Sequence, residues 1–198
     1  DILTIYVPLG FLLLFFRNLS NKTLLVVGAL LVLNIPTKCA EIVSILLRGK
    51  LQLIEDDFRV TGAVYYEIIK NGNFSAMIQH NIQAAGEKIN YQVNSGRGFI
   101  TFGFFLLGML AGRKQWFVSI QQNAALFKSL LKKSSLVLLT AVIAGILFGA
   151  ATFALKIDMQ ETPIAGWLMG FIVEFFNVSL TIVYITGVSL LMLRPKWA

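Results

Sequence analysis

Four polar side chains recur at helical spacing near the end of an otherwise apolar sequence. Counted from Glu174, the other three, Asn177, Thr181 and Tyr184, follow at offsets of three, seven and ten residues, which is a helical repeat. An ionisable side chain inside a membrane span is costly, so it usually faces a bundle interior, a cavity or a partner. This polar stripe predicts a path for a substrate or a proton, unless Glu174 lies near the outer headgroups and only hydrates the helix end.

Elsewhere the sequence holds no complete catalytic or cofactor-binding pattern. It has no P-loop, no G-x-S-x-G elbow, no H-E-x-x-H pair and no dinucleotide-binding glycine motif. His80 is the single histidine and has no cysteine or carboxylate cluster at ligand spacing, which favours a surface histidine over a metal ligand. Cys39 is the single cysteine and cannot form an intrachain disulfide. The residues alone predict no catalytic group, cofactor or metal ion.

The composition indicates which elements must position the polar stripe. Of 198 residues, 57% are hydrophobic and only 14% are charged, whereas soluble domains carry about 25% charged residues. Residues 134–155 contain no charged side chain, and about 20 apolar residues suffice to cross the hydrocarbon core of a bilayer. The net charge of +7 arises from basic residues clustered at the ends of apolar segments, which favours a lipid bilayer over nucleic acid as the partner.

Five apolar segments predict an all-α fold, a polytopic transmembrane helical bundle in which residues 1–198 form one membrane domain. The predicted spans cover residues 2–16, 23–47, 91–112, 134–155 and 164–193. The second span ends near Ile35 if Pro36 stops the helix, and near Leu47 if Pro36 only kinks it. The fifth span is about 30 residues long, so it must tilt or project beyond the bilayer.

The charges between the predicted spans alternate in a way that fits a multi-pass integral membrane protein. Residues 17–22 and 113–133 carry basic side chains and no acidic ones, whereas residues 38–97 and 156–161 carry both signs. Basic loops remain on the cytoplasmic side of a membrane. The pattern therefore predicts that Asp1 lies outside and that the C-terminal end lies in the cytoplasm.

Two stretches outside the spans have the period of amphipathic helices. The outer loop, residues 48–90, repeats apolar residues at helical steps before and after residues 71–73. On the cytoplasmic side, residues 115–132 have an apolar stripe beside Lys128, Lys132 and Lys133. Such a helix lies in the membrane interface, and its lysines favour anionic lipid at the cytoplasmic face.

Glycine pairs indicate where helices can approach closely. Three pairs have the G-x-x-x-G spacing, and they are Gly108 with Gly112, Gly145 with Gly149, and Gly166 with Gly170. This spacing lets two helix backbones come into contact. The pairs favour packing within the chain over a homo-oligomer, although both outcomes stay open.

Three short motifs resemble one family, the YeiB-like bacterial inner-membrane proteins. Asp1-Ile2-Leu3, Tyr6 and the segment Arg17-Asn18-Leu19-Ser20 resemble that family's "GDIL…Y…R.LS" segment. Residues 71–74 resemble its outer-loop "G-S-F" element, with Asn in place of Ser at position 73. Residues 104–109 followed by Gly112-Arg113 resemble its "F.LLGM…R" span.

This resemblance implies a location and two classes of function. It implies a multi-pass protein of the bacterial inner membrane, of which this chain is an internal piece, with Asp1 as the family's span-end acid. The family is grouped at a distance with membrane acyltransferases, and some members are described as related to transport. A membrane-embedded acyl-transfer enzyme and a transporter for a small solute therefore both stay open, with a purely structural role less favoured. A buried histidine with a nearby arginine would favour acyl transfer, and broken helices would favour transport.

Overall fold

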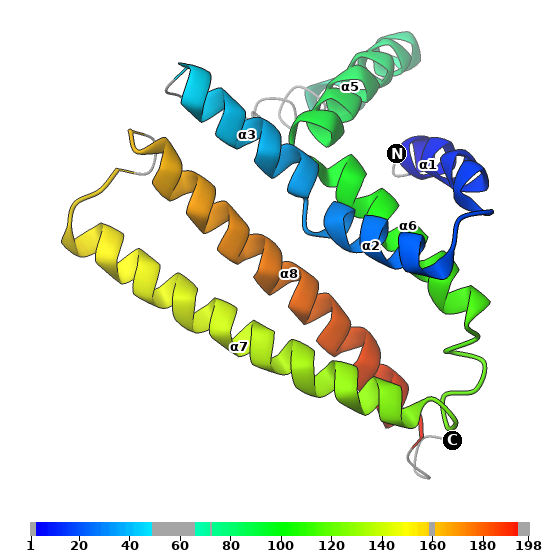
Figure 1. Ribbon diagram of the computed structural model, residues 1–198. Coiled ribbons are helices and arrows are strands. Elements are labelled where there is room, and N and C mark those ends of the chain that lie inside the picture. The colour runs from blue at the N-terminus through cyan, green and yellow to red at the C-terminus, as the bar shows by residue number, and fades with distance from the viewer. Residues whose placement is uncertain (1–2, 49–65, 72, 159–160, 194–198) are drawn as a thin grey trace.

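The computed structural model describes residues 3–48, 66–71, 73–158 and 161–193, and every regular element in these ranges is helical. The all-α prediction is therefore confirmed for this part of the chain. Residues 66–70 are also helical. The helices, labelled as in Figure 1, are α1 Leu3–Phe16, α2 Asn21–Val32, α3 Ile35–Arg48, α5 Phe74–Asn94, α6 Arg97–Arg113, α7 Ala124–Ala154 and α8 Pro163–Leu191.

The two longest helices, α7 and α8, form an antiparallel hairpin along one side of the molecule (Figure 1). They contain 31 and 29 residues, or about 46 and 43 Å at 1.5 Å per residue. By length and composition both can cross a membrane. Many of their large apolar side chains point outward, and Phe153 is 88% exposed. Lipid is the environment in which such a surface is stable.

The helices α2 and α3 form one bent pair rather than one straight span. The helix stops at Val32, resumes at Ile35 and changes direction by 48°. Pro36 lies in the first turn of α3, where the missing N–H of proline is tolerated. The predicted second span is therefore interrupted before Pro36 and then continues to Arg48. Counted as one unit, the pair is a third element long enough to cross a membrane.

A second break separates α5 from α6 at Ser95 and Gly96. Asn73 caps the start of α5, because its Oδ1 accepts a hydrogen bond from the Ala76 N–H at 3.2 Å. The helix predicted after residues 71–73 is confirmed, and it continues to Asn94. Residues 91–94, assigned from sequence to the third span, therefore belong to α5. The other predicted outer-loop helix falls on residues 49–65, outside the described residues.

The core of the molecule lies where α6 packs against α2 and α1. Leu24, Phe102, Leu106 and Leu110 are buried together. The backbones of α2 and α6 cross closely, since a Cβ placed on Gly103 would lie 2.7 Å from the Val32 nitrogen. This close approach requires glycine at position 103.

The predicted glycine pairs do not make this helix crossing. A Cβ on Gly108, Gly112 or Gly149 would meet nothing within 4 Å, and one on Gly145 would make ordinary contact with Ile172 at 3.6 Å. A Cβ on Gly170 would lie 2.6 Å from the Lys38 ammonium nitrogen. Close packing between helices therefore occurs at Gly28 and Gly103, whereas Gly170 lies under the Lys38 side chain. Of these three, only Gly170 belongs to a predicted pair.

At the end of the molecule predicted to face the cytoplasm, the helices differ from those predicted for residues 115–132. Residues 114–123 form turns, and α7 then runs without a break from Ala124 to Ala154. The separate interfacial helix predicted at 115–132 is therefore wrong, because its second half is the first part of α7. At this same end, the Arg113 guanidinium donates hydrogen bonds to the carbonyl oxygens of Leu19, at 2.7 Å, and Arg17.

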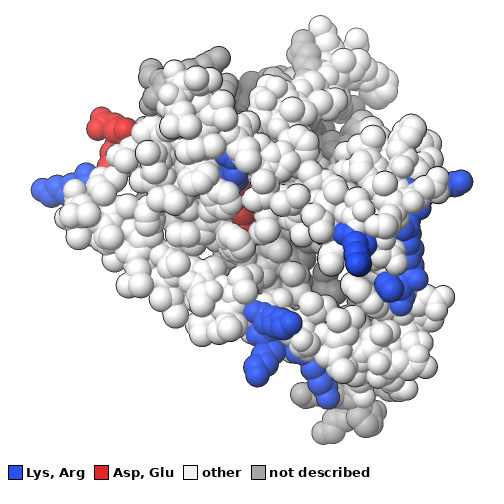
Figure 2. Space-filling view, in the orientation of Figure 1, with Lys and Arg blue, Asp and Glu red and all other residues white. Residues whose placement is uncertain are grey.

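The described chain has two helices long and apolar enough to cross a membrane, or three with the bent pair. The helices α1 and α6 have 14 and 17 residues, fewer than the roughly 20 that a span needs. Figure 2 shows a largely uncharged face with basic side chains toward one end. A small acidic and basic patch also lies at its centre, between α3 and α8 (Figures 1 and 2).

Candidate functional site

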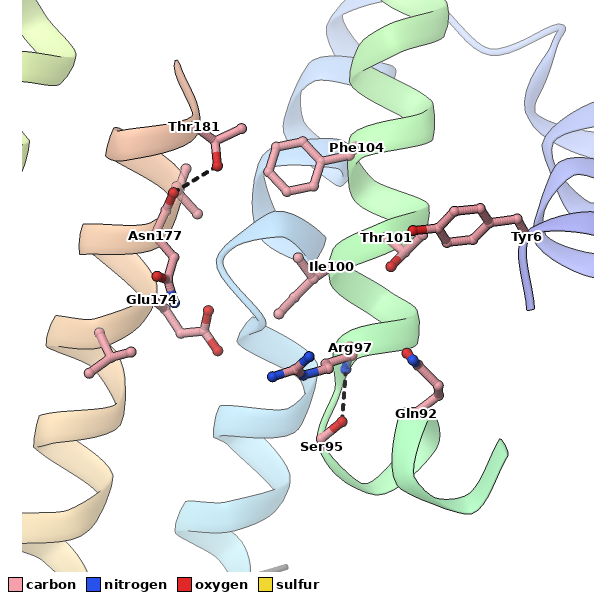
Figure 3. Close-up of a pocket in the computed structure, with 12 residues that line it drawn as sticks. Tyr6, Gln92, Ser95, Arg97, Ile100, Thr101, Phe104, Glu174, Asn177 and Thr181 are labelled. Atoms are coloured by element: carbon pink, nitrogen blue, oxygen red, sulfur yellow. Dashed lines mark hydrogen bonds between the residues drawn. The ribbon is translucent and has the colours of Figure 1, made fainter. Parts of the chain in front are cut away.

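A cavity of about 590 Å³ opens between α6 and α8, close to the two helix breaks (Figure 3). Its wall includes one aromatic residue from α1, Tyr6, whose ring packs edge-on against Phe105 with the centroids 5.8 Å apart. The polar residues that line it are Tyr6, Gln92, Ser95, Arg97, Thr101, Glu174, Asn177 and Thr181. Ile100, Phe104, Val173 and Val178 supply the apolar part of the wall. Such a mixture suits a small polar ligand with an apolar portion.

Glu174 lies far from both ends of its helix. It is eleven residues after Pro163 and seventeen before Leu191, or about 16 and 26 Å along the axis. Its Oε1 accepts a hydrogen bond from the Asn34 Nδ2 at 3.2 Å. This position and this partner oppose the simpler interpretation, in which Glu174 only hydrates a helix end at the headgroups.

Asn34 connects the two helix breaks to this carboxylate. The residue is 2% exposed, and its Nδ2 donates to the Ser95 carbonyl at 3.3 Å as well as to Glu174. Its backbone has a left-handed φ of 54°, a conformation that asparagine tolerates better than most residues. The local sequence thus ends α2 at a residue whose side chain can bond both α8 and the α5–α6 break.

Gly96 completes the junction from the other side. Its φ is +72°, and a Cβ at this position would collide with Asn34 Oδ1 and Thr37 Oγ1. Two residues with left-handed backbone therefore lie against each other, one from each broken helix pair. Glycine is required at position 96 both for its backbone conformation and for this close contact.

The first turns of α3 dock on α8 through two further contacts, both made by Lys38. The Trp167 Nε1 donates to the Lys38 carbonyl at 3.0 Å, and the Lys38 side chain lies over Gly170. The Lys38 ammonium is 2.8 Å from a Glu41 carboxylate oxygen. The exposed fractions of these two side chains are 10% and 23%. The pair neutralises itself, which lowers the cost of placing both charges in an apolar segment.

Arg97 and Glu174 extend toward each other from opposite walls of the cavity (Figure 3). The Arg97 guanidinium also lies 5.3 Å from the centroid of the Tyr91 ring, a favourable cation–π distance. Within the part of the chain that the structure describes, no Lys or Arg nitrogen lies within 4.0 Å of the Glu174 carboxylate. The cavity therefore presents one positive and one negative group that do not form an ion pair with each other.

The structure brings three of the four predicted stripe residues to the cavity. Glu174, Asn177 and Thr181 line it, and the Thr181 hydroxyl donates to the Asn177 carbonyl at 2.9 Å. Tyr184 does not line it and is 71% exposed. The reason is helical geometry, because ten residues at about 100° each turn Tyr184 roughly 80° away from Glu174. Asp1, the candidate family acid, lies outside the described residues.

Sequence reasoning missed Asn34, Lys38 and Arg97 as parts of the site. A signal was available for the first two, since both lie inside the predicted second span, where polar and ionisable residues usually serve a function. The same signal was available for Arg97, which lies inside the predicted third span, although it also ends a segment that carries charges of both signs. Among the described residues, no group of three His, Cys, Asp or Glu side chains could hold a metal ion.

Comparisons with known proteins identify no relative from which the role of this site could be inferred. No family model, curated protein or solved structure matches the chain. The chemistry of the cavity is therefore argued from its own residues. They can bind a small molecule that carries polar or charged groups, in a position reached by two interrupted helices and one continuous helix.

Proposed function

We propose that this protein is a membrane transporter for a small polar solute, which binds in the cavity between α6 and α8. The observation that carries the proposal is the meeting of two helix breaks, at Asn34 and Gly96, beside the Glu174 carboxylate. Interrupted helices are costly within a bilayer and are tolerated where they are buried in protein or line a cavity. Many secondary transporters form their substrate sites from such discontinuous helices.

The cavity wall favours a zwitterionic solute such as a small amino acid. Arg97 suits a carboxylate, and Glu174 suits an ammonium group, since each is a cavity-lining charge of the opposite sign. The hydroxyl and amide groups of Thr101, Asn177 and Thr181 can accept or donate further hydrogen bonds. A solute with one charge of each sign would pair with both groups, so that neither its own charges nor the half-buried Glu174 carboxylate would be left without a partner.

Uptake into liposomes tests this function directly. The full-length protein is reconstituted, and electrogenic or radiolabelled uptake of glycine, serine and alanine is compared with uptake of glucose and choline. We expect uptake of at least one amino acid above protein-free liposomes, and its loss in Glu174→Gln, because the neutral amide cannot pair with an ammonium group.

Glu161→Gln is the matched control for the uptake experiment. Glu161 is exposed at the beginning of the segment leading into α8 and does not line the cavity. We expect this variant to transport at the rate of the unchanged protein. Transport that survives in Glu174→Gln, or uptake of none of the amino acids, would contradict the proposal.

A second candidate function is acyl transfer, which one feature of the site favours. Asn34 holds the Glu174 carboxylate at the edge of a cavity, where it could take a proton from an acceptor hydroxyl or amine. The acceptor oxygen or nitrogen would bond to the acyl carbon, and the thiolate of a thioester donor would leave. Incubation with radiolabelled acetyl-CoA and glucosamine distinguishes this candidate, since only an acyltransferase yields labelled N-acetylglucosamine or O-acetyl product.

We also propose that the chain crosses the bacterial inner membrane five times, through α7, α8, the α2–α3 pair and the two shorter helices α1 and α6, around which the bilayer would have to be thinner. The length of α7 supports its place as one of these spans, because its 31 residues exceed a ~30 Å core by about ten residues. The first ten residues of α7 carry Lys128, Lys132 and Lys133, which suit anionic lipid at the cytoplasmic face. Labelling of Lys128→Cys from outside intact cells would contradict this topology, whereas Asn73→Cys should be labelled.

A further inference from the structure

The junction of the two broken helix pairs contains side-chain oxygens that are buried and lack a hydrogen-bond partner. Within the described residues, Asn34 Oδ1 and Thr37 Oγ1 are two of three such atoms. Both lie against Gly96, because a Cβ at that residue would contact each of them. A buried acceptor without a partner costs about 1–3 kcal/mol. Two such oxygens against the same residue, Gly96, indicate a bound ligand that is coordinated by oxygen atoms.

The chemistry of these atoms points to a cation rather than to an anion. Asn34 cannot turn its amide to supply a donor here, because its Nδ2 already serves the Ser95 carbonyl and Glu174. Its Oδ1 must therefore face Gly96 and Thr37. Amide and hydroxyl oxygens are ligands for hard cations.

The charges around the junction leave one negative charge for such a cation. Lys38 and Glu41 form an ion pair at 2.8 Å, so their charges neutralise each other. Arg97 is exposed and stacks near Tyr91. Glu174 remains, and its bond to the Asn34 amide polarises that amide and makes Oδ1 a stronger acceptor. A single uncompensated carboxylate balances a monovalent ion.

We propose that Na⁺ binds at this junction, between the Asn34 amide oxygen and the Thr37 hydroxyl, with Glu174 supplying the balancing charge through Asn34. The ion would hold the two breaks together and set the position of Glu174 at the cavity. As a coupling ion it rests on the proposed transport function. Its binding, however, is measured without transport.

Thermal unfolding of the purified full-length protein tests the site. The midpoint temperature is measured in increasing NaCl, with choline chloride keeping the ionic strength constant, and again with KCl in place of NaCl. We expect a saturable rise with Na⁺ that K⁺ reproduces less well. Thr37→Val removes the hydroxyl with little change in shape, and we expect it to weaken the apparent Na⁺ affinity at least about tenfold.

Two further variants show whether a lost Na⁺ response in Thr37→Val comes from the missing hydroxyl or from a damaged fold. Thr186→Val is the matched control, since Thr186 is also buried but its hydroxyl donates to the Ile182 carbonyl of its own helix, away from the junction. It should keep the full response to Na⁺. Thr37→Ser retains the oxygen and should also respond, which maintains the test if Thr37→Val does not fold.

The possible results are distinct. A Na⁺ response that is lost in Thr37→Val and retained in Thr186→Val supports the site, even if no solute is transported. An unchanged midpoint in Na⁺, or an unchanged response in Thr37→Val, overturns it. Amino-acid uptake that proceeds without Na⁺ binding would leave the proposed function in place and remove the coupling ion alone.

Discussion

The α7–α8 hairpin and the junction of the broken helices are built in opposite ways. In the hairpin, hydroxyl groups bond within their own helix, as the Thr152 hydroxyl does to the Gly149 carbonyl and the Thr186 hydroxyl to the Ile182 carbonyl. At the junction, Asn34 bonds residues 61 and 140 positions away in the sequence. The hairpin is therefore locally determined. The junction holds polar groups that only distant segments can satisfy.

This difference explains where the cavity lies in the molecule. Continuous helices satisfy their own backbone groups and leave apolar side chains for lipid. Broken helices expose backbone and polar side chains, so they must be enclosed by other elements. The cavity lies where the continuous α8 passes the junction, and Glu174 is the point at which the two kinds of structure meet.

Asn34→Ala should produce the largest difference between the two regions. It removes two long-range hydrogen bonds, one of them to a carboxylate, and places alanine in a left-handed backbone conformation. We expect a loss of about 3–4 kcal/mol in the free energy of unfolding, measured by SDS titration. Asn34→Gly should recover about 1 kcal/mol of this loss, because glycine adopts positive φ freely.

The counterpart in the hairpin is Thr152→Val, which removes a buried hydroxyl that bonds only within α7. We expect it to change the free energy of unfolding by at most about 1 kcal/mol. Equal losses in Asn34→Ala and Thr152→Val would show that the long-range bonds at the junction add no stability.

Gly103→Ala compared with Gly145→Ala tests backbone packing in the two regions. A Cβ on Gly103 would lie 2.7 Å from the Val32 nitrogen and 2.9 Å from the Gly28 carbonyl oxygen, so the helices must separate. We expect a loss of about 1–3 kcal/mol. A Cβ on Gly145 would meet only Ile172 at 3.6 Å, so the better helix propensity of alanine should leave stability unchanged or raised by up to about 1 kcal/mol. Thermal unfolding in detergent measures both, and a reversed order would contradict the close crossing of α2 and α6.

Trp167→Phe should have a smaller effect than Asn34→Ala, because it changes only one contact between the two regions. It removes the hydrogen bond to the Lys38 carbonyl and retains an aromatic ring beside Phe171, whose centroid lies 4.7 Å from that of the Trp167 ring in the unchanged protein. We expect a loss of about 1 kcal/mol in the free energy of unfolding. No measurable loss would indicate that α3 docks on α8 through Asn34 and Lys38 alone.

The sequence allowed part of the site to be predicted, and its limits have physical causes. The helical repeat placed Glu174, Asn177 and Thr181 on one wall of the cavity, because spacing within one helix is fixed by its pitch. Tyr184, the fourth residue of the predicted stripe, lies outside the cavity, since ten residues turn it roughly 80° from Glu174. Asn34 and Gly96 could not be paired from sequence, because a contact between residues 62 positions apart depends on how the helices pack.

The sequence by itself determined that the chain is helical and largely apolar, because long runs without charges satisfy their backbone only as helices in lipid. It also singled out Glu174, because a carboxylate amid apolar residues is costly, and it left open whether this residue serves a function or hydrates a helix end. Only the tertiary structure decided where the helices break and what those breaks contact. Asn34 and Gly96, both with left-handed backbone, lie against each other although they are 62 positions apart in the sequence. The polar stripe became a cavity wall because residues of α6 face it across the cavity.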